Sequence, residues 1–155
     1  MGTHILRQLD FAAKGFLAFL PLIYVGCSSS PVESAVANVC VSEDASLVRT
    51  RGYLRLPMAT DVILREPVPA EERRKLIVVE KPNGTGAFVT AFVTSTDRGE
   101  PNRVGVMPAS YTYNDLHVYS NAGKVISPDE PVLVTGRVKK SAANCTLDVE
   151  EIEIP

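Results

Sequence analysis

An alternating pattern at the carboxyl-terminal end constrains the fold of this 155-residue chain more than any other feature. In 131–140 every second residue is apolar or glycine, and the same period returns in 145–154 after the short connection 141–144. A period of two puts apolar side chains on one face of a β-strand and polar side chains on the other. The sequence therefore predicts a half-buried terminal hairpin. The inward-facing residues of its first strand are Val132, Val134, Gly136 and Val138.

The second strand of this hairpin changes phase near its middle. Cys145, Leu147 and Val149 form one inward set, whereas Ile152 faces the same way only if one residue is inserted at 150–151. An inserted residue of this kind is a β-bulge, which bends one strand against its partner. We therefore expect a bulge in the last strand of the chain.

Turn signals divide the chain before this hairpin into further strands. Residues 46–57 alternate with the same period, and Asn83-Gly84 separates the apolar runs 76–81 and 86–94. An Asn-Gly pair between two apolar runs is a strong hairpin signal. This part of the chain is therefore expected to add at least three strands to the terminal hairpin.

The remaining segments carry weaker patterns. Short apolar stretches at 116–120 and 124–126 predict two small strands, and the Gly and Pro residues of 95–115 predict a long loop or short edge strands and not a regular helix. The order Pro, Glu, Arg, Lys in 69–76 suits a short helical turn, because acidic residues are favoured at the start of a helix and basic residues at its end.

The order of these strands resembles that of an OB-fold. The first strand of that family often carries a glycine within an alternating run, as in 48–54, and its last two strands form an alternating hairpin like 132–152. The resemblance implies an all-β domain over residues 46–155, built as a small closed or partly open barrel. It departs from the family at 95–115, which do not supply the usual helix. An immunoglobulin-like β-sandwich is the alternative fold.

The amino-terminal segment has the composition of an export signal. Residues 1–15 contain Arg7 and Lys14, and an uncharged apolar run of ten residues follows at 16–25. A helix needs about 20 apolar residues to span a bilayer, so this run is too short. The tripeptide that follows, Val25-Gly26-Cys27, resembles the lipobox of bacterial lipoproteins, although Tyr24 stands where leucine is usual.

The lipobox resemblance implies that residues 1–26 are a signal peptide and that Cys27 becomes the first residue of the mature protein. Its thiol would carry a diacylglyceryl group with fatty acyl chains such as palmitate. This lipid would anchor the protein to a membrane of the cell envelope, the periplasmic side of the outer membrane in a Gram-negative cell. The small, polar residues of 27–45 would form a flexible tether. Ordinary cleavage after Ala35-Val36-Ala37 is the alternative, and it would release a soluble protein.

The cysteine count fits either route of export. Cys27 is acylated or removed with the signal, which leaves Cys40 and Cys145 as an even pair. Such a pair predicts a disulfide in an oxidising compartment, and two unrelated buried thiols are the alternative. The OB-fold resemblance favours the disulfide, because that topology places the end of the fourth strand beside the start of the first, and a bridge requires such proximity.

Composition and side-chain chemistry favour binding over catalysis. The net charge is −2 and tryptophan is absent, which weighs against a nucleic-acid partner. His117 is the single histidine after the signal, and no cluster of residues predicts a catalytic centre, a metal site or a cofactor. The outward face of the strand at 46–57 is a possible ligand-binding surface, but the favoured interpretation is the solvated side of a half-buried strand whose charges are balanced by nearby acids. The residues of this face are Arg49, Arg51, Tyr53 and Arg55.

Two functions are therefore expected. The first is a non-catalytic binding or assembly module, lipid-anchored through Cys27 in the cell envelope, with the membrane and an envelope protein as partners. The second is a soluble secreted or periplasmic domain that recognises an anionic ligand through the basic strand face. In the first function Cys27 is kept and acylated, whereas in the second it is removed with the signal.

Overall fold

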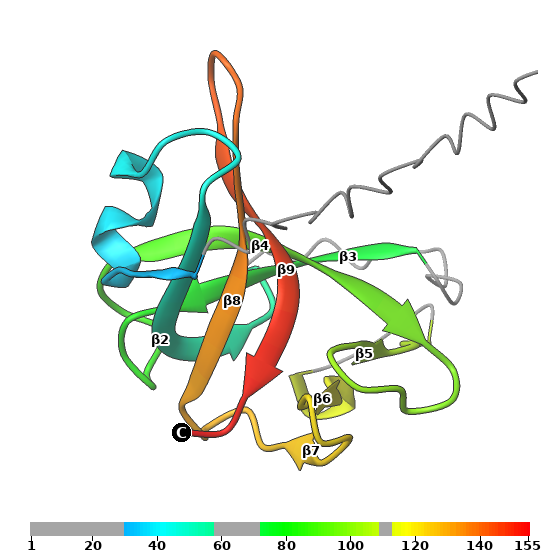
Figure 1. The fold of residues 1–155 in the computed structure, drawn as a ribbon. Coiled ribbons are helices and arrows are strands. Elements are labelled where there is room, and N and C mark those ends of the chain that lie inside the picture. The colour runs from blue at the N-terminus through cyan, green and yellow to red at the C-terminus, as the bar shows by residue number, and fades with distance from the viewer. Residues whose placement is uncertain (1–29, 58–71, 109–112) are drawn as a thin grey trace, which may run out of the picture.

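A computed structural model describes residues 30–57, 72–108 and 113–155 of the chain. Within these ranges the long strands close into a five-stranded β-barrel, so the predicted all-β barrel is confirmed and the two-sheet sandwich is not (Figure 1). The five strands are β2 (Leu47–Arg55), β3 (Arg73–Val79), β4 (Phe88–Thr96), β8 (Val132–Lys140) and β9 (Cys145–Glu153).

The strand order of the barrel is that of an OB-fold. β2 pairs antiparallel with β3 and with β8, β3 pairs antiparallel with β4, and β8 pairs antiparallel with β9. The ring closes through a parallel contact between β4 and β9, which are the third and fifth strands of the barrel. Leu47 at the start of β2 lies opposite Arg137 near the end of β8, as the predicted topology requires.

The predicted bulge is confirmed in β9. Thr135 of β8 lies opposite Glu151, whereas the next residue, Gly136, lies opposite Val149, so Glu150 is the inserted residue. Gly136 allows the two strands to approach closely at this point. A Cβ atom there would lie 2.5 Å from the carbonyl oxygen of Asp148, which is too close for any side chain.

The helical turn predicted over residues 69–76 is wrong from Arg73 onward, because β3 begins there. Arg74, Leu76 and Val78 are buried inside the barrel and alternate with exposed or half-exposed residues. Burial of this face against β4 outweighs the weak preference of the local charge order for a helix. Residues 69–71 of the predicted turn lie outside the described residues, and Glu72 forms a bend.

An irregular insert replaces the helix that an OB-fold usually carries between its third and fourth strands. It contains β5 (Val104–Gly105), the short 3₁₀ helix η2 (Tyr113–Asp115), β6 (Val118–Tyr119) and β7 (Val125–Ile126). The two small strands predicted at 116–120 and 124–126 are therefore present, at least in part. The insert supplies the hydrophobic core with five buried side chains, namely Val104, Met107, Leu116, Val118 and Ile126.

Most of the segment expected to be a flexible tether, 27–45, is instead part of the folded domain. Residues Val32–Glu33 form β1, which pairs in parallel with Val48 and Arg49, and Val36–Val41 form a 3₁₀ helix, η1. Val36 and Val39 are buried in the core, since residues three apart lie on one side of a 3₁₀ helix. The domain therefore begins at Val32, and residues 27–29 lie outside the described residues.

A disulfide joins η1 to the start of β9. Cys40 and Cys145 are bonded, with their Cα atoms 5.8 Å apart and 105 positions apart in the sequence. The predicted pairing is thus confirmed. The bridge holds the amino-terminal segment against the barrel at the point where β8 and β9 meet.

Candidate functional site

The basic face predicted on β2 is largely occupied by interactions within the protein. Arg49 forms an ion pair with Glu153 at the end of β9, and the carboxylate of Glu33 lies 3.9 Å from its Nε atom. Arg51 is exposed, and Tyr53 is half-buried. The structure therefore keeps these residues on one strand face but leaves few of their charges open to a ligand.

Arg55 connects two turns through its hydrogen bonds. Its side chain is 10% exposed, and its guanidinium donates to the carbonyl oxygens of Pro82 and Pro128 and to the carboxylate of Asp129. The bonds to Pro128 and Asp129 measure 2.7 and 2.9 Å. A buried cation bonded in this way positions the turn after β3 against the turn before β8, so its role is structural.

Replacement of Arg55 tests this assignment. Arg55→Ala is expected to lower the free energy of unfolding by about 2–3 kcal/mol, because hydrogen bonds from a charged donor are lost and two carbonyl groups lose a partner. Asp129→Ala is the matched control, with an expected loss below about 1 kcal/mol, since its carboxylate is 82% exposed. Urea unfolding of both variants measures the difference. Equal losses would contradict a structural role for the guanidinium.

Arg51 lines a shallow groove on the same side of the barrel. The groove has a volume of about 430 Å³. Glu33 and Glu80 are part of its lining, so two carboxylates accompany this one cation. An anionic ligand would meet acidic side chains here, which disfavours the predicted anion-binding role of this face.

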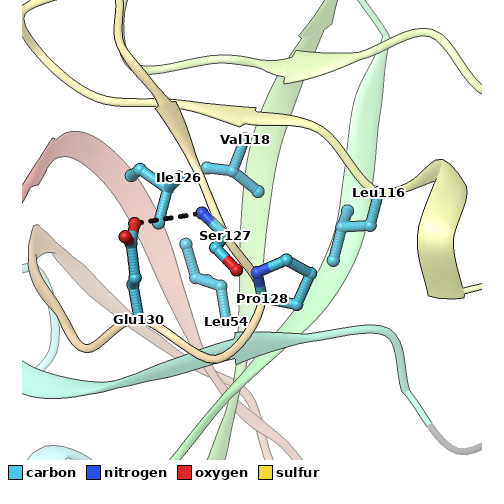
Figure 2. Close-up of a pocket in the computed structure, with 7 residues that line it drawn as sticks. All are labelled: Leu54, Leu116, Val118, Ile126, Ser127, Pro128 and Glu130. Atoms are coloured by element: carbon cyan, nitrogen blue, oxygen red, sulfur yellow. Dashed lines mark hydrogen bonds between the residues drawn. The ribbon is translucent and has the colours of Figure 1, made fainter.

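The enclosed cavity at the junction of the barrel and the insert is too small for a ligand (Figure 2). Its volume is about 10 Å³, roughly the space that one water molecule requires. Ser127 N–H donates to Glu130 there at 3.1 Å, which closes the turn beneath it. The cavity is a packing gap lined mainly by apolar side chains. Its lining residues are Leu54, Leu116, Val118, Ile126, Ser127, Pro128 and Glu130.

A different surface has the chemistry of a binding face. The outward side chains of β3, β4 and β9 form adjacent rows, because Lys75 lies opposite Phe92 and Phe92 lies opposite Asp148. In the next row, Ile77, Thr90 and Thr146 lie side by side. We call this surface the β3–β4–β9 face, defined by Arg73, Lys75, Ile77, Phe88, Thr90, Phe92, Thr146 and Asp148.

Aromatic rings and cations meet on the β3–β4–β9 face. The guanidinium of Arg73 lies over the ring of Phe92, 5.6 Å from its centre, and also forms an ion pair with Asp148. Phe88 is 65% exposed, which is unusual for a phenylalanine, and Lys75 beside this row is also exposed. Exposed rings offer a stacking surface to sugars, bases or aromatic side chains, and the flanking cation and hydroxyl groups supply polar contacts.

Sequence reasoning missed the β3–β4–β9 face, although one signal for it was present. Phe88 and Phe92 alternate with the apolar residues Val89, Ala91 and Val93, so one of the two sets had to face outward. The second set is buried in the barrel. The contact with Asp148 depends on the parallel pairing of β4 with β9, and a pattern within one strand does not reveal it.

Comparisons with protein-family models, with curated proteins and with solved structures find no match to this chain. In the part of the chain that the structure describes, no group of three or more His, Cys, Asp and Glu side chains is placed to hold a metal ion. None of the helices in that part is long and apolar enough to cross a bilayer. The function proposed below therefore depends on the residues and geometry of the chain itself.

Proposed function

We propose that this protein is an exported lipoprotein, anchored in a membrane of the cell envelope through Cys27, whose OB-like barrel is a non-catalytic binding module. The bond between Cys40 and Cys145 is the observation that carries this proposal. It accounts for both cysteines of the domain and leaves Cys27, at the end of the apolar run, as the single cysteine outside the bridge. A structural disulfide is typical of exported proteins.

The binding surface of this module is the β3–β4–β9 face. OB-folds bind ligands over the face of their second and third strands, which are β3 and β4 in this barrel. Phe88 and Lys75 supply an aromatic surface and an exposed cation at that position. Arg51, on the neighbouring strand β2, lies beside acidic groups. An envelope protein is the proposed partner, because export removes the module from cellular nucleic acid.

A capture experiment with matched variants tests the binding face. Phe88→Ala with Lys75→Glu is expected to reduce capture of envelope partners by at least about tenfold, because exposed aromatic anchors carry much of the energy of an interface. Both side chains are exposed, so the barrel should still fold. Detergent-solubilised envelopes are the source, and quantitative mass spectrometry measures what is retained.

Arg51→Glu is the control for this experiment, because it also reverses an exposed charge but lies on β2. It is expected to leave capture unchanged. Loss of capture with Arg51→Glu, together with normal capture by the Phe88→Ala and Lys75→Glu protein, would move the binding surface back to the basic strand face.

A further inference from the structure

The distance from the proposed lipid anchor to the folded domain is unusually short. Only residues 28–31 stand between Cys27 and the first residue of β1, Val32. A fully extended chain over these five steps spans at most about 17 Å. β1 is itself fixed to the barrel, because it pairs with β2 and Ser34 N–H donates to the carbonyl of Arg49 at 2.9 Å.

We propose that this short tether holds the β1–η1 side of the barrel close to the lipid bilayer and keeps the insert strand β7 farther from it. The inference rests on the proposed acylation of Cys27. With the anchor in the membrane interface, β1 stays within about 17 Å of that interface. A tether of nineteen residues, as the sequence alone suggested at 27–45, would have left the barrel free to turn.

The topology of the barrel places β2 next to the anchored strand β1 and the insert strand β7 far from it. In the closed ring, the neighbours of β2 are β3 and β8, so β4 and β9 lie across the barrel from it. β1 pairs only with β2 among the described strands. Figure 1 shows β1 and η1 on the left of the barrel and the insert with β5, β6 and β7 at the lower right. β7 is at the other end of the strand order from β1, whereas η1 packs against β4 as well as β2, so β7 is the part of the domain that this tether keeps farther from the lipid.

The surface of the β1–η1 side fits an uncharged interfacial contact. Val32 is 60% exposed and Val41 is 77% exposed, so two apolar side chains stand free on this side. The charges near them include Glu33, whose side chain is 72% exposed, and they give no excess of cations that would attract anionic lipid. Contact with the bilayer should therefore depend on the length of the tether and not on the charge of the lipid.

Single tryptophan reporters can test this orientation, because the natural chain contains no tryptophan. The acylated full-chain product is reconstituted into phosphatidylcholine vesicles with a trace of lipid that carries dansyl on its headgroup. Energy transfer from the Val32→Trp protein is expected to be at least about twofold more efficient than from the Val125→Trp protein, because the tether keeps β1 within about 17 Å of the interface. Val125 is a suitable distant site, since it is 48% exposed in β7.

A protein with a longer tether tests whether the length of the tether causes the difference in energy transfer. Insertion of roughly 20 Gly and Ser residues between Ser30 and Pro31 gives an r.m.s. reach of about 25 Å, and transfer from Val32→Trp should then fall toward that of Val125→Trp. Equal transfer from both sites with the natural tether would overturn the orientation, and so would the absence of any effect of the insertion.

The mass of the amino-terminal peptide is measured on the same samples, so the two proposals fail separately. An acylated Cys27 with equal transfer from the two reporters overturns the orientation alone. A peptide without acyl chains on Cys27 overturns the proposed anchoring, and the orientation with it. An acylated Cys27 with transfer confined to the Val32→Trp protein supports both.

Discussion

Cys145→Ala is expected to lower the free energy of unfolding by about 4 kcal/mol, the largest stability change that the structure predicts for one side chain. The bridge from Cys40 closes a loop of 105 positions, and the chain-entropy model assigns about 4–5 kcal/mol to a loop of that size. The bridge also holds η1 against the barrel, where Val36 and Val39 are buried. Guanidinium unfolding of the purified protein measures the loss.

Two controls assign this loss to the bridge. Cys40→Ala should cost as much as Cys145→Ala, and the double variant should cost no more than either one, because all three remove the same bond. A reducing agent should lower the stability of the natural protein to that of the variants and leave the variants unchanged. Natural protein that keeps its full stability under reduction would contradict a stabilising disulfide.

Cys27→Ala is expected to transfer nearly all of the protein from the membrane fraction to the soluble fraction. Each buried methylene of an acyl chain contributes about 0.8 kcal/mol to membrane binding, so the two chains of a diacylglyceryl group anchor the protein stably. Without the thiol that carries this group, the protein should lose its attachment to the membrane. Ultracentrifugation of lysed cells and immunoblotting measure the distribution. Ser28→Ala is the matched control, because it changes the neighbouring residue and keeps the thiol.

The same two variants can also contradict the proposed anchoring through Cys27. If Cys27→Ala protein remains in the membrane fraction to the same extent as Ser28→Ala protein, Cys27 does not hold the chain there. A natural protein found mainly in the soluble fraction would favour the alternative cleavage after Ala37, which removes Cys27 altogether.

The elements that sequence predicted correctly are those whose signals are local. A period of two assigns each residue of a strand to a face without knowledge of its neighbours, and the phase change around Glu150 shows as a break in that period. The barrel and its strand order followed from the resemblance of the alternating segments to an OB-fold. The parallel contact of β4 with β9 confirmed that order independently.

The elements that sequence failed to predict depend on distant partners. Nearby acids were expected to balance the charge of Arg49, but the sequence did not identify its partner Glu153, which is 104 positions away. Arg55 is likewise bonded to Asp129, 74 positions away. The alternating pattern of one strand predicts which face of the sheet a charged side chain is on. It does not identify the oppositely charged group that pairs with that side chain.

The folded state of 32–45 was not predicted for a different reason. The composition of 28–45 is small and polar, as in a flexible linker. Its four valines have no strong period, so the sequence does not single out the two that are buried, Val36 and Val39. Their burial follows from contact with the barrel, and β1 follows from pairing with β2. The structure therefore assigns residues 32–45, expected to be a flexible tether, to the folded domain.

The mass of the amino-terminal tryptic peptide tests the central claim most directly. After reduction, an anchored protein should yield the peptide Cys27–Arg49, since Arg49 is the first basic residue after the cysteine, with the added mass of a diacylglyceryl group on Cys27. A peptide that begins at Asn38, or one that begins at Gly15 and contains an unmodified Cys27, would contradict the account.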